Sequence, residues 1–480
     1  MGCTEWVEMN QKNKPQSNAI ATGILALLTT GMFLAGTLYN SKTESLKWTL
    51  EHSDSTVLLT RLLFHIASVV GALATWFLIQ RYAKKQINFV LMSFVIIGSI
   101  VSIAAPNHLI AVAFARSLMG LAHGMAYLVV LIHGGEILVK ELRGVIMAAV
   151  NFCIISGIMI GAIMSSVNEA SLEPHQFMGI LGLCYMAMAF FLNLLVCYES
   201  PVFLMQRNLN AEAERSLMKL RNESTATWDI RNELTEIKAM LSEDASTTGS
   251  IFRDGNLRPL VLVGLGKIAS VLSFNCAVNS VKLNVIDEVL SIKDADVSLS
   301  VTILTSIRLV VGMFGMFTVD LYGRRALQLV STVSTGLVLS AMGIAYLATD
   351  SITPEVGMGV LLASEVGASI GLTFVPDVLC SEAFNTKKKA LTITVLHVLE
   401  NALHVIIYSI IFQWDYWTTQ EYYGGTLLVA GAPLLAIAFM LYRKLPETSK
   451  MSIRQARIEF YKREGIVFGG SKNSVEVLYD

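Results

Sequence analysis

We single out six of the side chains that can carry a charge or a proton and lie within long apolar stretches of this sequence. They are Arg308, Glu365, Asp377, His397, Glu400 and His404. A charge at the centre of a lipid bilayer costs roughly 3 kcal/mol even on the gentler scales, so a charged side chain there normally faces a cavity or a partner. We therefore expect these residues to contact one another, a solute or a proton rather than lipid.

Two interpretations of Arg308 and Asp377 are consistent with that cost. The two side chains either form an ion pair that joins two helices, or they contact an ionic or zwitterionic solute. Exchanging the two charges would separate these alternatives, because restored function after the double exchange would favour the internal pair.

His397 and His404 are seven residues apart, so they share one helix face, and Glu400 lies between them. Two histidines and a glutamate are ligands that a metal ion accepts. No third ligand is visible in a neighbouring loop, so a proton relay or a packing role is the favoured interpretation. We expect neither a metal nor another cofactor.

The elements that position these residues follow from the composition. Apolar residues make up 54% of the chain and charged residues 15%, whereas a soluble domain is typically about 45–50% apolar and about 25% charged. Twelve apolar stretches of about 18–24 residues are each near the length that a helix needs to cross a bilayer. They are residues 19–39, 56–79, 87–105, 109–132, 145–166, 177–197, 260–284, 297–319, 327–348, 357–379, 391–412 and 425–442. The sequence thus predicts an all-α membrane protein with twelve transmembrane helices.

Basic residues gather in alternate loops between these stretches. They are Arg81, Lys84, Lys85, Lys140, Arg143, Arg324, Arg325 and residues 387–389. Because such residues accumulate on the cytoplasmic side, we expect both termini in the cytoplasm. The expected division is a cytoplasmic N-terminus (1–18), a six-helix bundle (19–198), a helical cytoplasmic linker (199–259), a second six-helix bundle (260–444) and a cytoplasmic tail (445–480).

The two bundles repeat short motifs in register. Arg81-Tyr-Ala-Lys84-Lys85 after the second stretch matches Asp320-Leu-Tyr-Gly323-Arg324-Arg325 after the eighth. Glu136 precedes Arg143-Gly144 by seven residues, as Glu382 precedes Lys389-Ala390, and Tyr198-Glu199-Ser200-Pro201 matches Pro446-Glu447-Thr448. A parallel repeat of six-helix halves, with a binding site at their interface, is typical of one class of secondary transporters.

On these motifs, from about Ile20 to Ser449, the sequence resembles the sugar porter family of the major facilitator superfamily, the group of glucose and trehalose facilitators. Arg116-Ser-Leu-Met-Gly120 and Ser381-Glu382-Ala-Phe384 also match. The resemblance implies two pseudo-symmetric six-helix bundles. We expect no enzymatic activity, because no nucleophile elbow, phosphate-binding loop or HExxH motif is present.

The resemblance also implies a gate of acids and bases at the cytoplasmic helix ends, which pair when that side is closed and part when it opens. The implied gate residues are Arg116, Glu136, Arg143, Glu199, Asp320, Arg324, Arg325, Glu382 and Glu447. Anchoring by the positive-inside rule is the alternative, and it explains lone lysine clusters such as 387–389 equally well.

Departures from the family are concentrated where the substrate is bound. Ala269 and Ser270 stand where the family has a Gln pair, and Asn401 is followed by Ala402 instead of Trp. Arg308 and Asp377 occupy positions that line the family's cavity. The candidate substrate-binding residues are Asn151, Ser270, Asn275, Arg308, Asp377 and Asn401.

The expected function is transport of a sugar or related small polar solute by alternating access. A facilitator is favoured over a proton symporter, because Ala19–Tyr39 contains no Asp or Glu. Two alternatives remain open: a non-transporting sensor of the same fold, and a carrier of a charged organic solute through Arg308 and Asp377. The expected partners are the solute and the bilayer, with no nucleic acid at a net charge of -1. The plasma membrane is the family's usual location.

Overall fold

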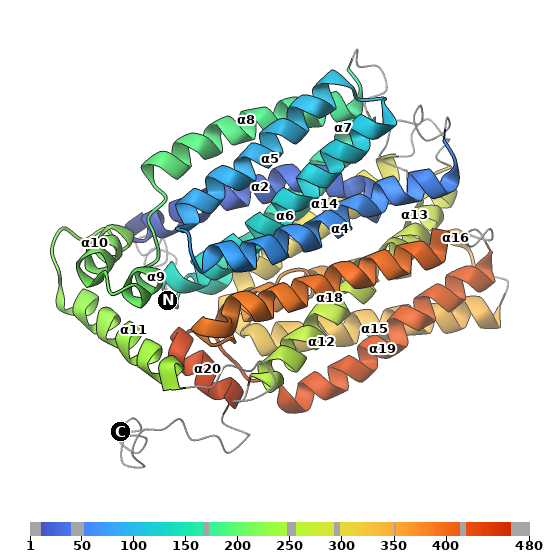
Figure 1. The fold of residues 1–480 in the computed structure, drawn as a ribbon. Coiled ribbons are helices and arrows are strands. Elements are labelled where there is room, and N and C mark those ends of the chain that lie inside the picture. The colour runs from blue at the N-terminus through green and yellow to red at the C-terminus, as the bar shows by residue number, and fades with distance from the viewer. Residues whose placement is uncertain are drawn as a thin grey trace.

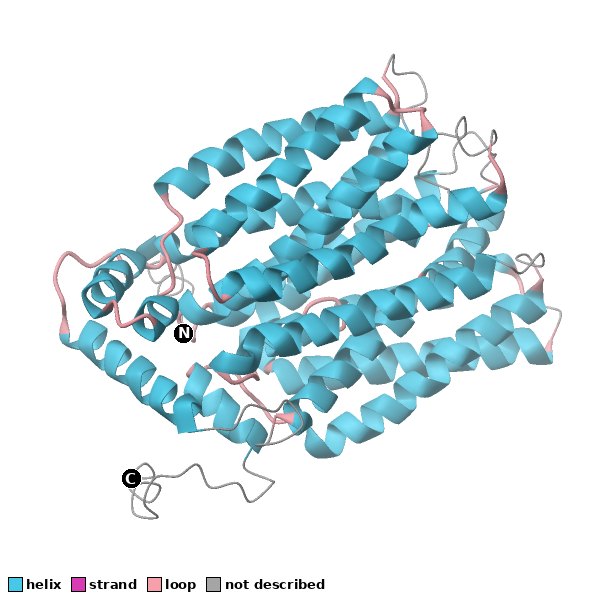
Figure 2. Cartoon of the chain, viewed as in Figure 1, coloured by secondary structure: helices cyan, strands magenta, loops and turns pink. Residues whose placement is uncertain are grey.

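The computed structural model describes residues 11–39, 52–166, 172–246, 256–291, 298–349, 352–412 and 419–461. These residues form helices joined by short loops, and none of them is in a strand (Figure 2). The outer parts of the two predicted terminal segments, residues 1–10 and 462–480, lie outside the described residues.

Six long helices form the first bundle, and each runs without interruption. They are α2 (Lys14–Leu38), α4 (Asp54–Ile79), α5 (Lys84–Ala104), α6 (Leu109–Ile137), α7 (Arg143–Ser166) and α8 (Pro174–Leu195). Figure 1 shows them together in the upper part of the molecule, coloured from blue to green. Each is long and apolar enough to cross a bilayer.

Eight helices form the second bundle, coloured from yellow-green to red in Figure 1. They are α12 (Leu257–Phe274), α13 (Cys276–Leu290), α14 (Ser298–Tyr322), α15 (Arg324–Ala348), α16 (Pro354–Ser369), α17 (Val375–Glu382), α18 (Thr386–Phe412) and α19 (Gln420–Lys444). Eleven candidate spans are found among the described residues. The tenth predicted crossing is missing from that count because it is divided into α16 and α17.

Both interruptions in the second bundle have a chemical cause. Asn275 ends α12 and caps α13, because its side-chain oxygen accepts the backbone N–H groups of Ala277 and Val278 at 2.9 and 3.0 Å. Between α16 and α17 the hydroxyl of Ser331 accepts the Leu372 N–H at 3.0 Å and donates to the Gly367 carbonyl at 2.6 Å. Backbone groups that leave a helix inside a membrane need such partners.

Small residues allow the helices of the first bundle to pack closely. A Cβ atom at Gly124 of α6 would collide with the Ser68 carbonyl oxygen of α4, and one at Gly157 of α7 would collide with the Leu28 carbonyl oxygen of α2. Helices without side chains at the contact can bring their backbones together, which is how helices associate in lipid. Gly124 and Gly157 thus allow α6 to pack closely on α4, and α7 on α2.

Large apolar side chains remain exposed along the outer surface of both bundles. Phe191, Leu195, Phe314 and Val429 are each more than 60% exposed. Exposed apolar surface of this extent marks an interaction with a membrane or another protein. A bilayer around the two bundles would cover it.

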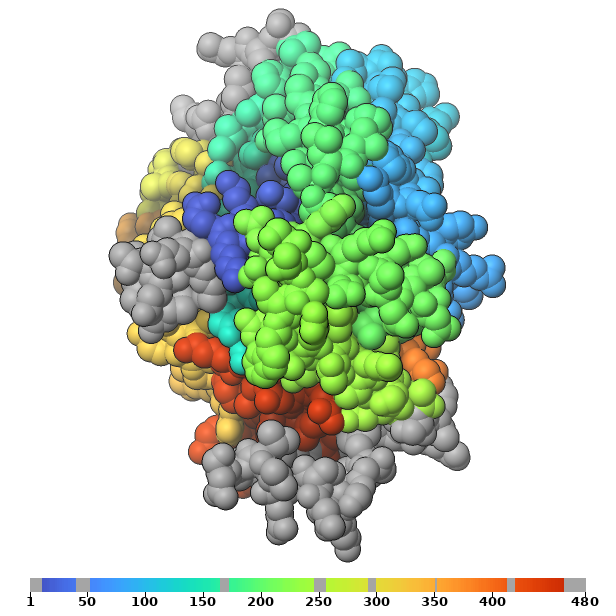
Figure 3. All heavy atoms as spheres, turned by 90° about the vertical axis from the view of Figure 1, so that its left-hand side faces the viewer, coloured from blue at the N-terminus to red at the C-terminus, as the bar shows by residue number. Residues whose placement is uncertain are grey.

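Four short helices lie across one end of the bundles: α9 (Pro201–Gln206), α10 (Asn210–Leu220), α11 (Trp228–Ser246) and α20 (Ile453–Tyr461). Figure 3 looks onto this end, where the green linker lies beside the blue start of α2 and the red α20. Arg221 donates to the Ile137 carbonyl of the first bundle at 2.8 Å, and Asp244 accepts the Thr386 N–H of the second bundle at 3.0 Å. The linker thus contacts both bundles. We call this end of the molecule the linker end.

Candidate solute site and gates

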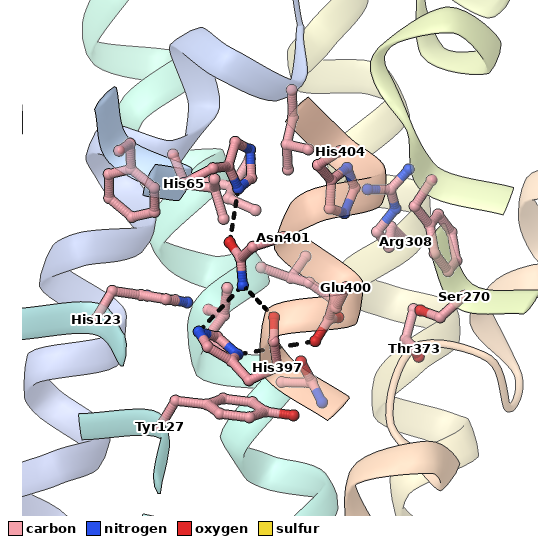
Figure 4. Close-up of a pocket in the computed structure, with 18 residues that line it drawn as sticks. His65, His123, Tyr127, Ser270, Arg308, Thr373, His397, Glu400, Asn401 and His404 are labelled. Atoms are coloured by element: carbon pink, nitrogen blue, oxygen red, sulfur yellow. Dashed lines mark hydrogen bonds and ion pairs between the residues drawn. The ribbon is translucent and has the colours of Figure 1, made fainter. Parts of the chain in front are cut away.

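A cavity of about 120 Å³ lies between the two bundles, and both contribute to its wall. Figure 4 shows polar side chains from both bundles directed into this space. The polar and ionisable residues that line it are His65, His123, Tyr127, Asn151, Ser270, Arg308, Thr373, His397, Glu400, Asn401 and His404. Leucine, isoleucine and phenylalanine side chains complete the wall. A concave, largely apolar site with a few convergent polar groups is the usual form of a small-molecule site.

Hydrogen bonds join the two bundles at the cavity wall. His65 of α4 lies 2.8 Å from the amide oxygen of Asn401, and Ser68 of α4 lies 2.8 Å from Nε2 of His397. Asn401 also contacts Nε2 of His397 at 3.1 Å (Figure 4). The Tyr127 ring stacks on His397 with 4.6 Å between ring centroids. The wall is therefore a connected polar network that spans the interface.

Three charged side chains form a cluster at the edge of the cavity, here called the lysine triad: Lys267 of α12, Asp377 of α17 and Glu400 of α18. The Lys267 ammonium pairs with Asp377 and lies 3.0 Å from Glu400. Its third contact is the Tyr127 hydroxyl at 2.5 Å. Asp377 in turn accepts hydrogen bonds from Tyr127 and Asn151 of the first bundle. The three N–H groups of the ammonium thus each have a partner.

A second cluster, here called the glutamate triad, consists of one acid and two cations: Glu365 of α16, Arg308 of α14 and Lys282 of α13. The Glu365 carboxylate accepts from Arg308 at 2.5 Å and from Lys282 at 2.6 Å. Arg308 also donates to the Tyr39 hydroxyl at 3.0 Å. Of the two interpretations of Arg308 and Asp377, the structure does not show the ion pair between them, because each of the two residues is paired within a different triad.

Four of the six candidate substrate residues line the cavity, namely Asn151, Ser270, Arg308 and Asn401. Asp377 lies just behind the wall, where Asn151 and Tyr127 contact it. Asn275 does not line the cavity. Its amide is occupied by the backbone at the α12–α13 interruption, where it donates to the Val271 carbonyl at 3.0 Å and caps α13. The structure thus gives Asn275 a structural role in place of the predicted contact with substrate.

Sequence reasoning missed Lys267, Lys282 and Tyr127. Both lysines lie in the seventh apolar stretch, so the cost of a charge in lipid was a usable signal for them. Tyr127 carries no such signal, because a tyrosine in an apolar helix is ordinary core material. Its role depends on the approach of α17 from the other bundle, which a single sequence does not reveal.

The predicted histidine face is part of the network. His397 Nδ1 lies 3.9 Å from Glu400, and the His404 ring stacks on His65 with 5.1 Å between centroids. No group of three metal-binding side chains comes together within the part of the chain that the structure describes.

Among the described residues, an ion pair and a hydrogen bond connect the bundles at the linker end. Arg143 of α7 lies 3.8 Å from Glu382 of α17, and the Val145 N–H donates to Asp320 of α14 at 3.0 Å. Arg143 also donates to the Met451 carbonyl at 3.1 Å, which ties it to the tail. These contacts close the linker end in this structure.

The other predicted gate pairs lie within one bundle. In the second bundle, Arg324 contacts Asp320 at 2.6 Å and Glu382 at 3.1 Å. In the first, Lys84 contacts Glu136 at 3.1 Å and Glu199 at 3.2 Å. Arg324 thus holds Asp320 and Glu382, the two acids that the Val145 N–H and Arg143 reach from the first bundle.

Glu199 and Glu447 have equivalent positions in the two bundles. The Glu199 carboxylate accepts the Lys84 N–H at 2.7 Å, at the start of α5. The Glu447 carboxylate accepts the N–H groups of Arg324 and Arg325 at 3.0 and 3.1 Å, at the start of α15. A carboxylate at a helix N-terminus satisfies free donors and complements the helix dipole. The repeated motifs therefore perform the same local task in each bundle.

Arg116 was wrongly placed in the predicted gate. It lies in the second turn of α6, whereas Glu136 lies in the last turn. Twenty residues of helix separate them by about 30 Å. Arg116 is buried, and it lies toward the end of the bundle opposite the linker end.

Further contacts join the bundles at the end opposite the linker. Arg61 of α4 donates to the Tyr408 hydroxyl of α18 at 3.0 Å, and Asn279 of α13 donates to the Leu38 carbonyl of α2 at 3.3 Å. Leu62, Cys276, Ala277, Tyr408 and Ile411 form a small apolar cluster beside them. Contacts between the bundles therefore lie on both sides of the cavity.

Comparison with known proteins agrees with this architecture. The model of the family described as "Sugar (and other) transporter" matches residues 19–460. Sugar transporter ERD6-like 17 of Arabidopsis thaliana is 24% identical over 404 residues, which cover 82% of this chain and 81% of that protein. The facilitated glucose transporter member 2 of Gallus gallus is 23% identical over 415 residues, covering 84% and 75%.

Solved structures share the fold. The proton:xylose symporter XylE bound to 6-bromo-6-deoxy-D-glucose matches with a TM-score of 0.77 at 16% identity, covering 93% of this chain and 99% of that one. The inward-open conformation of the xylose transporter XylE from E. coli matches with a TM-score of 0.63 at 15% identity, covering 92% and 98%.

The fold and the interfacial cavity define a multi-pass membrane transporter with the twelve-helix architecture of the major facilitator superfamily. The chain belongs to the sugar (and other) transporter family of that superfamily, the sugar porters. The predicted fold class and family are thereby confirmed, as is the prediction of a carrier rather than an enzyme.

Proposed function

We propose that this protein moves a sugar or a related small hydroxylated solute across the plasma membrane by alternating access, with the cavity between the bundles as its binding site. The observation that carries the proposal is the position of the cavity at the interface, with separable contacts between the bundles on either side. A site at the interface of two six-helix repeats is where alternating access needs it.

The chemistry of the wall supports a hydroxylated solute. Asn151 and Asn401 offer amide groups, Ser270 and Thr373 offer hydroxyls, and these can donate to or accept from a sugar hydroxyl. Phe64, Phe274 and Tyr127 supply aromatic surface. The relatives named above are sugar and glucose transporters, and the ligand of the XylE structure is a modified glucose.

Two sets of contacts would break in turn during the cycle. Opening the linker end separates Arg143 from Glu382 and the Val145 N–H from Asp320. Opening the other end separates Arg61 from Tyr408. Each set is small and polar, so the two closed states can be close in free energy, as a carrier requires.

The linker end is proposed to face the cytoplasm, with both termini on that side. The basic residues of the short loops support this orientation, since Arg81, Lys140, Arg325 and Lys388 all belong to loops or helix ends at the linker end.

The internal pairing disfavours the alternative of a charged solute held by Arg308 and Asp377. Arg308 already contacts Glu365 and Tyr39, and Asp377 already contacts Lys267. A solute with a net charge would have to displace a buried partner, which is costly.

Uptake into liposomes containing the purified protein tests the proposal, with a hexose, a disaccharide, a polyol and an organic anion as solutes. We expect saturable uptake of a hydroxylated solute, with uptake by the Asn401→Leu variant reduced about tenfold, a loss of roughly 1.4 kcal/mol of binding. Thr394→Val is the matched control, because this buried hydroxyl on the same helix bonds to the Ala390 carbonyl of its own helix, outside the cavity. Uptake of the anion alone, or no uptake of any solute by folded protein, would contradict the proposal. The second result would favour a sensor.

A further inference from the structure

The lysine triad holds two carboxylates and one ammonium group within the membrane-spanning part of the molecule. The Lys267 and Asp377 side chains are each 3% exposed, and the Glu400 side chain is 21% exposed. With all three groups ionised, the triad carries one excess negative charge. An uncompensated buried charge is strongly unfavourable, so the site needs a further positive partner or a proton.

The surroundings of the triad offer no nearby permanent cation among the described residues. The glutamate triad has an excess positive charge, but it belongs to a separate network, and Arg308 faces the cavity from another helix (Figure 4). The other titratable groups of the described residues that interact with the lysine triad are Tyr127 and His123 of α6, Cys380 of α17, and His397 and His404 of α18, and His65 of α4 contacts these histidines.

Glu400 is the member of the triad that a proton can reach. One of its oxygens, Oε2, accepts from Lys267, and the residue lines the cavity. Asp377 is enclosed instead, with Lys267 and Tyr127 on Oδ1 and Asn151 on Oδ2. The two carboxylates thus differ in access although they share one ammonium group.

The same triad is connected to the motion of the bundles. The donors Tyr127 and Asn151 belong to α6 and α7 of the first bundle, whereas all three triad members belong to the second. The bundles cannot separate at α17 without removing two hydrogen bonds from Asp377. Lys267 and Glu400 must then redistribute their contacts, so the proton occupancy of the triad and the separation of the bundles are linked.

We propose that the lysine triad is a proton-binding site, in which Glu400 takes up one proton from the cavity and releases it when the cavity opens to the other side. The proton comes from water on one side of the membrane and returns to water on the other, with no bond changed besides the carboxyl O–H. The coupling to solute movement rests on the proposed carrier function, and it replaces the sequence-based expectation of simple facilitated diffusion.

Infrared difference spectroscopy between acid and alkaline pH tests the site without a known solute, because the proton itself is the probe. Wild-type protein in lipid nanodiscs is expected to show a pH-dependent C=O stretching band of a protonated carboxyl group. Glu400→Gln should lose the band. Glu400→Asp should retain it at a changed frequency, and this variant serves also if the first does not fold. Glu288→Gln, which removes an exposed carboxylate at the end of α13, should leave the band intact.

Uptake into liposomes supplies the second measurement. An inward proton gradient should raise initial uptake of the transported sugar several-fold in the wild type, whereas any uptake that Glu400→Gln retains should be the same with and without the gradient.

The absence of a Glu400-dependent infrared band would overturn the proposed proton site even if the sugar is transported. A Glu400-dependent band with no solute transported would instead support the proton site and contradict the proposed solute. A gradient effect with an imidazole signal and no carboxyl band would assign the proton to His397 and overturn the proposal.

Discussion

At the scale of single residues, charge inside an apolar helix was the most informative sequence signal, but it did not reveal which charges meet. Glu365, Arg308 and Asp377 were recognised from their positions alone. Their partners come from other helices: Lys282 for Glu365, and Lys267 for Asp377. Pairing depends on the rotation and depth of each helix, and hydropathy reports neither. The wrong placement of Arg116 has a different cause, because the predicted span 109–132, which leads toward Lys140 and Arg143, already puts Arg116 near the end opposite the cytoplasm.

The glutamate triad should contribute strongly to stability through its single acid. In Glu365→Gln, Arg308 and Lys282 would lose their shared carboxylate in a fully buried site. Removing one partner of a buried ion pair typically costs about 3–5 kcal/mol. We expect a clear fall in the thermal unfolding temperature of the detergent-solubilised protein. A variant as stable as the wild type would show that the two cations have another counter-charge.

At the scale of elements, the crossings were predictable and their interruptions were not. Length and apolarity place a helix such as α15 (Arg324–Ala348) within a few residues of the predicted 327–348. The interruptions at Asn275 and at residues 370–374 depend on hydrogen bonds from side chains such as Ser331, which a hydropathy window averages away. Family resemblance indicated Asn275 as a substrate contact, whereas its local geometry makes it a cap.

The cap at Asn275 leads to a graded prediction. Asn275→Ala removes the acceptor for the N–H groups of Ala277 and Val278 and should destabilise the protein by about 1–2 kcal/mol. Asn275→Ser retains an N-cap acceptor and should cost less. Thermal unfolding of the three proteins gives the order, and equal stability of the Ala and Ser variants would argue against a capping role.

At the scale of the whole molecule, the linker end behaves as one assembly of bundles, linker and tail. The family resemblance implies a gate at this end, and the structure places contacts between the bundles there. The contacts that cross the interface, Arg143–Glu382 and Val145–Asp320, were not separable in sequence from the in-bundle pairs around them.

Loss of the crossing contact should open the linker end. Arg143→Gln removes an ion pair with Glu382, while Arg324 still holds that acid. We expect the ratio of open to closed molecules to rise about tenfold, a shift of roughly 1.4 kcal/mol. Distances between spin labels at the exposed positions Tyr82 and Tyr322 report the change. Lys140→Gln is the matched control, because this exposed cation of the same loop contacts its neighbour Glu141. An unchanged distance distribution in Arg143→Gln would remove this contact from the gate.

Two ion pairs attach the tail helix α20 to α11, and they differ in burial. Arg457–Asp244 is almost completely buried, whereas Arg454–Glu243 is partly exposed. The hydrogen bond to Glu243 raises the pKa of the Arg454 guanidinium. Asp244→Asn should accelerate hydrogen exchange of the α20 amides markedly, and Glu243→Gln should have a small effect of about 0–1 kcal/mol. Equal effects would mean that burial does not decide the attachment.

The unequal continuity of the two bundles has a mechanical consequence. The first bundle consists of six unbroken rods, whereas the second contains joints at Asn275 and at residues 370–374. The first bundle can therefore act as the rigid half of the protein, and the second bundle as the half that changes shape. Rotation at these interruptions would move α13 relative to α12 and α17 relative to α16. Because α17 lies at the linker end and α13 leads to the opposite end, the two ends of the cavity can open separately. The short helix α17 carries both Asp377 and Glu382, so a single rotation of α17 would move Asp377 away from Lys267 and Glu382 away from Arg143 at the same time.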